Sequence, residues 1–242
     1  MTDRDSLTAA RLDLHWAGRI LSAGADATVK SEADDSHSNL GWDVGQQALT
    51  CRAGAHIHVP TFTLHHGEEV FKLGGSSLEA GKRWLGERLG ASLSLREYDA
   101  PAEPRDASES FAPDMAALKR VAEWFSFATR AMSEMGELRI WPHHFDLGYF
   151  QDKGHGGKSI GGGFAVGDEH YASPYFYVNP YGIDRPDALP GLEHGFWTDK
   201  WFGAVLTVEA FEGSNGDDVA ARFISDAMAK SHGVLSLSLI HI

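Results

Sequence analysis

The sequence is poor in several features, and each shortage excludes a class of protein. It contains one cysteine, Cys51, so an internal disulfide framework is excluded. No apolar run approaches the roughly 20 residues that a transmembrane helix needs. The N-terminus, MTDRD, lacks the basic start and the apolar stretch of a signal peptide. We therefore expect a cytoplasmic protein that does not use a membrane as a partner.

Basic residues are also few. Lys and Arg total 21 against 34 Asp and Glu, which gives a formal charge of -13. Phosphate binding depends on clustered Lys and Arg, and no dense basic run occurs. The sequence therefore predicts no nucleic acid partner. The hydrophobic content of 43% is ordinary for a globular protein and allows a core of normal size.

The last six residues, 237–242 (LSLIHI), resemble a translated adapter. The codons CTG TCT CTT ATA CAC ATC encode them and match the transposon-end adapter of shotgun sequencing libraries. We interpret this tail as an artefact that makes few native contacts. His241 is accordingly not a candidate ligand, and we expect the natural C-terminus to be missing.

Hydrophobic periodicity predicts an α+β fold with mainly antiparallel sheets and helices packed on their outer faces. Helices are expected over residues 6–23, 77–90, 114–135 and 217–230. Strands are expected over residues 47–52, 56–64, 69–73, 138–150, 159–166, 175–178 and 203–208. The oligomeric state is left open.

A stretch rich in Pro, Ser and acidic residues, 97–113 (EYDAPAEPRDASESFAP), has the composition of a linker. It separates a first α+β half, residues 1–96, from a second α+β half, residues 114–236. Each half reads as a helix, several strands and a closing helix. An internal duplication and an ordinary α+β domain both fit this order of elements.

Candidate chemistry concentrates in the second half, first in the segment WPHHFD, residues 141–146. Alternate side chains of a strand share a face, so His144 and Asp146 are expected together. Such a pair binds a divalent metal, or acts as a base whose imidazole is oriented by the carboxylate. His143 would lie on the other face as a reserve metal ligand.

The segment GDEHY, residues 167–171, is expected to form a turn that carries Glu169 and His170. If this turn folds back on the preceding strand, it completes a catalytic or metal-binding set. The members of the set are His143, His144, Asp146, Glu169 and His170. The alternative is structural, with His143 hydrogen-bonded in the core and with Asp146 and Asp168 bonding turn backbone.

A second function class is binding without catalysis. The polar loop at residues 34–42 (DDSHSNLGW) and the aromatic run after Pro174 suit a small polar, sugar-like molecule. The side chains expected to contact it are Asp35, His37, Asn39, Trp42, Tyr175 and Tyr177. The alternative for the loop is a solvated turn.

Two further patterns point away from chemistry. Residues 157–161 fit G-x-S-x-G, but a nucleophile elbow needs a buried strand before it and a helix after it, and neither is expected here. Cys51 lies in an expected strand with Arg52 as its nearby basic neighbour. We expect it to be a buried, inert thiol.

Three segments resemble an uncharacterised bacterial family, a domain of unknown function. They are DDSHSNLGWD (34–43), WPHHFDLG (141–148) and GDEHYASPYFYVNP (167–180). The resemblance implies a bacterial, cytoplasmic protein whose three segments meet around one site, and it implies no activity.

If the protein is an enzyme, metal-dependent or His-based hydrolysis is the chemistry expected of the His, Asp and Glu residues in the second half. If it is not, the expected ligand is sugar-like.

Overall fold

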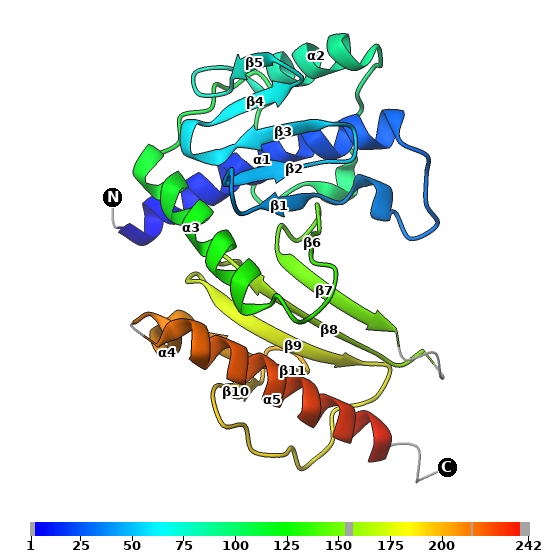
Figure 1. The fold of residues 1–242 in the computed structure, drawn as a ribbon, viewed down its shortest axis with the longest axis vertical. Coiled ribbons are helices and arrows are strands. Elements are labelled where there is room, and N and C mark those ends of the chain that lie inside the picture. Colours follow the sequence, from blue (N-terminus) through cyan, green and yellow to red (C-terminus); the bar gives the residue numbers. More distant parts are fainter. Residues whose placement is uncertain (1–2, 153–156, 214, 238–242) are drawn as a thin grey trace. The chain divides into compact units, whose positions relative to one another are not determined.

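The structure is a computed structural model that describes residues 3–152, 157–213 and 215–237 (Figure 1). The fold is α+β with two antiparallel sheets, as the sequence predicts. The chain divides into two compact units. The first runs up to Ser126 and includes Arg139–Asp146, and the second comprises Phe127–Leu138 and the chain from Leu147 onward.

The first unit is built around helix α1 (Asp3–Thr28). Every residue from 14 to 25 is buried, because the sheet and helix α2 (Leu78–Leu89) pack against it. Ser77 caps α2, since its hydroxyl accepts a hydrogen bond from the Ala80 amide at 3.2 Å. Two further helical turns of this unit are η1 (Ser36–Ser38) and η3 (Glu97–Asp99).

The first sheet is a simple meander in which each strand pairs with the next. Its strands are β1 (Gly41–Asp43), β2 (Ala48–Thr50), β3 (Ala55–His58), β4 (Thr63–His66) and β5 (Glu69–Lys72). Cross-strand neighbours Leu49, Ile57 and Leu64 are fully buried. The strand expected over residues 56–64 is interrupted by the turn η2 (Val59–Thr61), after which Phe62 has a φ of 50°.

Helix α3 (Met115–Ala131) begins where the sequence places it, and it contributes to both units. The Asp114 carboxylate accepts hydrogen bonds from the Ala116 and Ala117 amides at 2.8 and 3.3 Å, a helix N-cap. The helix ends four residues before the expected position, residue 135. The short strand β6 (Arg139–Ile140) follows, and Ile140 exchanges two backbone hydrogen bonds with Leu40 of the first unit.

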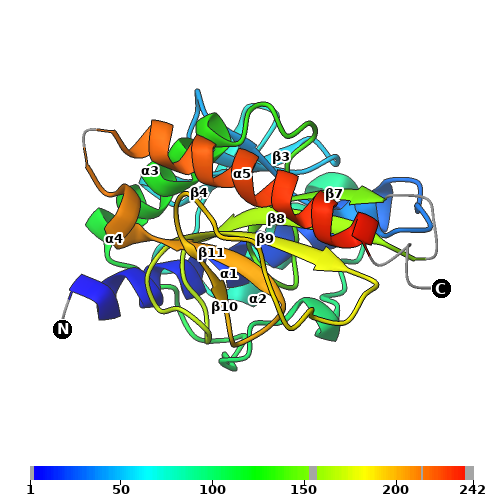
Figure 2. The ribbon, with the colours of Figure 1, turned by 90° about the horizontal axis from the view of Figure 1, so that it is seen from below.

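The second unit holds the remaining strands and helices. Its strands are β7 (Leu147–Asp152), β8 (Ser159–Ala165), β9 (Tyr175–Tyr181), β10 (Phe196–Thr198) and β11 (Gly203–Thr207). Their order is β10-β11-β9-β8-β7. Two helices complete the unit, α4 (Val208–Phe211) and α5 (Gly216–Leu237). Helix α5 crosses β9, β8 and β11 on one face of the sheet (Figure 2).

The two sheets differ in strand order. The first is sequential throughout, whereas β11 lies between β9 and β10 in the second. This difference counts against the internal duplication, although each unit retains the predicted order of helix, strands and helix. The similarity therefore lies in the order of the elements along the chain and not in how their strands pair.

The segment 97–113 packs as part of the first unit. Phe111 is 1% exposed, and the Arg105 guanidinium lies 2.6 Å from the Asp13 carboxylate of α1. The sequence analysis assigned this segment to a linker and began the second half at residue 114. The chain instead passes from the first unit to the second inside α3, after Ser126. It returns to the first unit at residue 139 and enters the second again at residue 147.

Two further expectations concern membrane-spanning helices and the C-terminal tail. Among the described residues, no helix has both the length and the apolarity to cross a membrane. Helix α5 continues beyond the expected residue 230 and ends at Leu237, the first residue of the suspected adapter. The rest of that tail, residues 238–242, lies outside the described residues.

Candidate functional site

The WPHHFD segment is a tight turn and not part of a continuous strand, so the strand expected over residues 138–150 is wrong at this point. The Phe145 amide donates to the Trp141 carbonyl at 2.7 Å, and the Trp141 amide donates to the Asp146 carbonyl at 3.1 Å. Phe145 adopts a φ of 55°, a conformation that few non-glycine residues take. His144 and Asp146 therefore do not share a strand face as expected: Asp146 is buried and His144 is exposed.

A histidine that the sequence analysis missed anchors this turn. The Nε2 atom of His15, on α1, donates to the Pro142 carbonyl at 2.7 Å. Its ring stacks on Phe145 with centroids 4.7 Å apart. Burial lowers the pKa of His15 to about 4, so the ring is neutral at pH 7. The available signal was a histidine between two large apolar residues, Leu14 and Trp16, on an expected helix.

His143 and His144 form an imidazole pair at the surface of the turn. Their ring centroids lie 4.2 Å apart, and Tyr98 lies 4.7 Å from His143. Burial, and secondarily the charge of the neighbouring His144, lower the pKa of His143 to about 4. His143 is therefore a neutral, half-buried imidazole at pH 7.

The GDEHY segment is a turn, as expected, but its carboxylate has a structural role. Asp168 Oδ1 accepts from the His170 and Tyr171 amides at 2.8 and 2.9 Å, which closes an Asx-turn. Asp168 Oδ2 accepts from the Tyr175 hydroxyl. The Glu169 side chain extends into solvent with 75% of its surface exposed, whereas the His170 ring, 46% exposed, packs on Trp201 with centroids 5.0 Å apart.

The proposed five-residue set is divided between the units. His143, His144 and Asp146 belong to the first, and Glu169 and His170 belong to the second. Within the part of the chain that the structure describes, no group of three or more His, Cys, Asp or Glu side chains could hold a metal ion. The shared hydrolytic or metal site therefore stays a prediction without geometric support.

The polar loop at residues 34–42 packs against the first unit instead of forming an open recess. His37 is 1% exposed, its Nε2 donates to Asp26 Oδ1 at 3.1 Å, and its Nδ1 accepts from the Glu32 amide at 3.2 Å. Arg96 lies 2.6 Å from the Asp26 carboxylate and 3.2 Å from that of Asp35. These contacts assign the loop a structural role.

Two further residues of the predicted ligand set also face inward. Asn39 is 8% exposed. Trp42 packs on Phe125 with ring centroids 5.2 Å apart and donates from its indole nitrogen to the Ser126 hydroxyl at 3.1 Å. Asn39 is therefore buried, and the half-buried Trp42 is held in place by these two contacts.

The sequence patterns set aside earlier have structural explanations. Ser159 is buried within strand β8, and no helix follows it, so G-x-S-x-G does not form a nucleophile elbow. Burial raises the pKa of the Cys51 thiol, which lies 3.4 Å from the Ala55 carbonyl. Cys51 is of intermediate exposure and not fully buried, and the raised pKa favours the less reactive thiol form, so its inertness stays a prediction.

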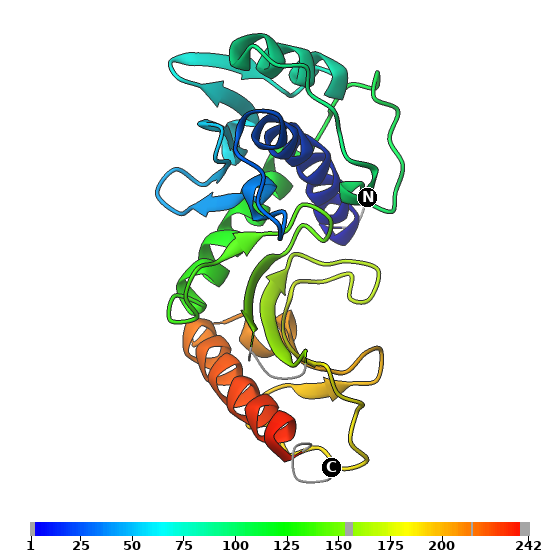
Figure 3. The same cartoon turned by 90° about the vertical axis from the view of Figure 1, so that its right-hand side faces the viewer.

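The second sheet has one face that carries exposed aromatic side chains, which we call the aromatic face. Strand register places Phe150, Tyr177, Asn179, Tyr181 and Phe196 on it, together with Asp152, Tyr175 and smaller side chains. Helix α5 lies along the opposite face of this sheet (Figure 3), where Phe164 and Phe176 are fully buried. Phe150, Tyr181 and Phe196 are 54%, 44% and 45% exposed.

Glycines leave room for aromatic rings close to the backbone of the sheet. A Cβ atom at Gly161 would be 3.0 Å from Tyr181 Cε2, and one at Gly163 would overlap the Tyr177 hydroxyl. At Gly203 a Cβ atom would overlap the Trp201 indole. A side chain at any of these three positions would therefore displace the neighbouring ring.

A hydrogen-bonded chain links two of these rings. The Trp201 indole nitrogen donates to Asn179 Oδ1 at 2.8 Å, and Asn179 Nδ2 donates to the Tyr181 hydroxyl at 3.2 Å. Phe150 lies beside Tyr181, with ring centroids 6.4 Å apart. The result is an aromatic platform with an uncharged amide between its rings.

Comparisons of the chain with protein-family models, curated proteins and solved structures found no match. The resemblance to an uncharacterised bacterial family, carried by residues 34–43, 141–148 and 167–180, accordingly stays a prediction. Any functional argument must therefore come from the site itself.

Of the residues expected to bind a polar ligand, Tyr177 alone lies on the aromatic face and is partly accessible. Tyr175 shares that face but is 4% exposed and hydrogen-bonded to Asp168. The sequence analysis missed Phe150, Asn179 and Tyr181. Alternating aromatic and polar residues in the run YFYVNPY could have identified two of them, because period-two alternation places Tyr177, Asn179 and Tyr181 on one face.

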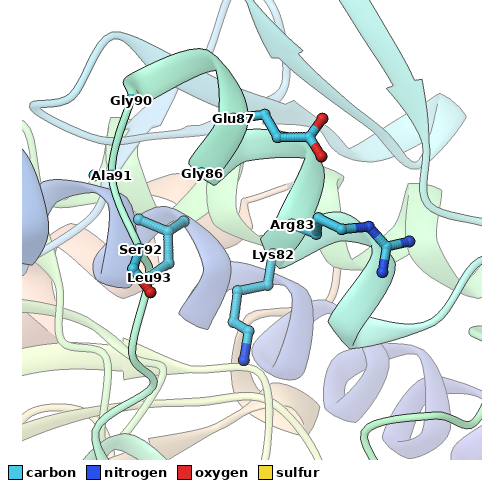
Figure 4. A pocket seen from close by; sticks show the side chains of 8 residues that line it. All are labelled: Lys82, Arg83, Gly86, Glu87, Gly90, Ala91, Ser92 and Leu93. Atoms are coloured by element: carbon cyan, nitrogen blue, oxygen red, sulfur yellow. The ribbon is translucent and has the colours of Figure 1, made fainter.

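The first unit has a groove of about 510 Å³ beside the C-terminal end of α2. Its walls are α2 and the segment from Gly90 to Leu93 (Figure 4). Lys82 extends away from Arg83 and Glu87 and forms an ion pair of 2.8 Å with Glu79. The charged groups of this groove do not converge on a common point.

Proposed function

We propose that the protein is a non-catalytic binding module that recognises a neutral saccharide on the aromatic face of its second unit. The observation that carries the proposal is the partly exposed Tyr181 ring against Gly161, with exposed Phe150 beside it and the Asn179 amide hydrogen-bonded to its hydroxyl. A pyranose ring has an apolar C–H face and hydroxyl groups around its edge. An aromatic ring next to an amide complements both features.

Charge favours a neutral ligand over a nucleotide or another anion. The amide of Asn179 and the hydroxyl of Tyr181 are uncharged, so the platform selects by hydrogen bonding. The formal charge of -13 on the whole chain repels phosphate groups. A planar nucleobase could stack on the same rings, but the phosphate attached to it would be repelled.

A panel of immobilised neutral oligosaccharides, built from glucose, galactose, mannose and N-acetylglucosamine, tests the proposal. We expect saturable binding to a subset of these sugars. Titration calorimetry with the strongest of them would then compare Tyr181→Ala and Phe150→Ala with the unaltered protein. Each substitution removes one stacking surface and should weaken binding about tenfold.

Tyr98→Ala is the matched control, because Tyr98 is an aromatic residue of the first unit with 72% of its surface exposed. It should leave saccharide binding unchanged. An equal loss in all three variants, or no binding to any sugar of the panel, would contradict the proposal.

A further inference from the structure

A second recess lies on the helix-covered side of the second unit, away from the aromatic face. It has a volume of about 620 Å³, within the range of small-molecule sites. Its walls come from the end of α3, the turn after α3, strand β7 and helix α5. We call it the α3–α5 groove.

The floor of the groove is apolar and adaptable. Met135 and Met228 are half-buried, and Ile224 is 4% exposed. Tyr149 lies on the helix side of the sheet, where a Cβ atom at Gly136 would be 3.3 Å from its ring. Methionine side chains adapt to ligands of different shape, and a tyrosine ring attracts cations through its π-face.

The rim of the groove is acidic. It carries three carboxylates, on Glu134, Asp217 and Asp218, against the guanidinium of Arg130. Asp218 forms an ion pair of 3.0 Å with Arg222. The remaining two carboxylates outnumber the one guanidinium, and the charge of -13 on the chain adds to the negative potential.

We propose that the α3–α5 groove binds an amphipathic organic cation, with its apolar body on the methionine and tyrosine floor and its ammonium group at Glu134 and Asp217. Helix α5 supplies the wall because residues 217, 221, 224 and 228 recur at steps of three and four and share one face. Neither the saccharide proposal nor any residue of the aromatic face enters this inference.

Three probes with the same aromatic group and different charges test it: dansylcadaverine, which is cationic, dansylamide, which is neutral, and dansylglycine, which is anionic. Dansyl emission at increasing protein concentration gives the dissociation constants. The cation should bind at least about fivefold more tightly than the anion, and this preference should shrink as salt is added.

Glu134→Gln and Asp217→Asn should each weaken binding of the cation about twofold to fivefold and leave the neutral probe unaffected. Asp187→Asn is the matched control, because it makes the same charge change at an exposed position of the second unit outside the groove. Ser225→Trp, at an exposed position of the wall, should fill the groove and weaken all three probes.

Equal binding of the cation and the anion would overturn the inference. If Asp187→Asn weakened cation binding as much as Glu134→Gln does, the effect would come from the overall charge of the protein, and the inference would fail. If Ser225→Trp left probe binding unchanged, the probes would bind elsewhere, which would also overturn the inference. Circular dichroism of each variant verifies that the fold is retained.

Discussion

The imidazole of His15 donates a hydrogen bond of 2.7 Å to the carbonyl of Pro142, 127 residues further along the chain. This contact fastens the WPHHFD turn to the central helix of the first unit. It also explains why Phe145 can hold a φ of 55°, since stacking on the His15 ring fixes its side chain. The most distinctive segment of the sequence is thus part of the core of its unit.

The first prediction concerns stability against pH. The pKa of His15 is lowered from 6.5 to about 4 in the folded protein, so the unfolded chain binds more protons between these values. The resulting stability is fully present above about pH 6.5 and is lost as pH falls towards about 4. The whole shift corresponds to roughly 3 kcal/mol.

Urea unfolding at several pH values measures this effect. His15→Gln keeps a hydrogen-bond donor but cannot titrate in this range, so its free energy of unfolding should fall less steeply below about pH 6.5. Some pH dependence should remain, because the lowered pKa of His143 acts in the same direction. An unchanged slope in His15→Gln would show that His15 is not buried as a neutral ring.

The second prediction concerns the Asx-turn. Asp168→Ala removes the acceptor for two backbone amides and for the Tyr175 hydroxyl, and should destabilise the second unit by roughly 1–3 kcal/mol. Glu169→Ala, next to it in the sequence and exposed, should change the free energy of unfolding by less than about 0.5 kcal/mol. Thermal unfolding of the two variants makes the comparison, and equal effects would contradict a structural role for Asp168.

The third prediction separates binding from stability on the aromatic face. The Cβ atom in Gly161→Ala would lie 3.0 Å from Tyr181 Cε2, so the ring must tilt away from the sheet. Saccharide binding should weaken about as much as in Tyr181→Ala, with a small change in thermal midpoint, since Tyr181 is partly exposed and can move. Gly191→Ala, in the same unit, tests for a general cost of losing glycine, because nothing lies within 4 Å of a Cβ atom there and its φ is not in the left-handed region. Full binding by Gly161→Ala would mean that the position of the Tyr181 ring against Gly161 is not needed.

Local patterns predicted the helices and the α+β class because capping residues and apolar periodicity act within a few residues of the chain. Ser77 and Asp114 mark helix starts in the sequence and in the structure. The turn at WPHHFD was missed because its left-handed residue is Phe145 and not glycine or asparagine. The role of His37 was also hidden, because its hydrogen bond to Asp26 and its packing on α1 depend on how the loop folds back on that helix.

The aromatic face was only partly predictable for a related reason. Alternation along β9 places Tyr177, Asn179 and Tyr181 together, but the neighbours that make them a platform come from other strands. Phe150 joins through the register of β7 with β8, and Trp201 joins through the loop before β11. Pairing between distant strands cannot be read from spacing along one strand.

The most direct test of the central claim is a titration with a saccharide identified on the panel, monitored by two-dimensional nitrogen–proton NMR. The account predicts saturable shifts of the Asn179 side-chain amide and of the Trp201 indole N–H, while the Trp42 indole N–H of the first unit stays in place. Shifts confined to Trp42 and its surroundings, with Asn179 and Trp201 unaffected at saturating saccharide, would contradict it.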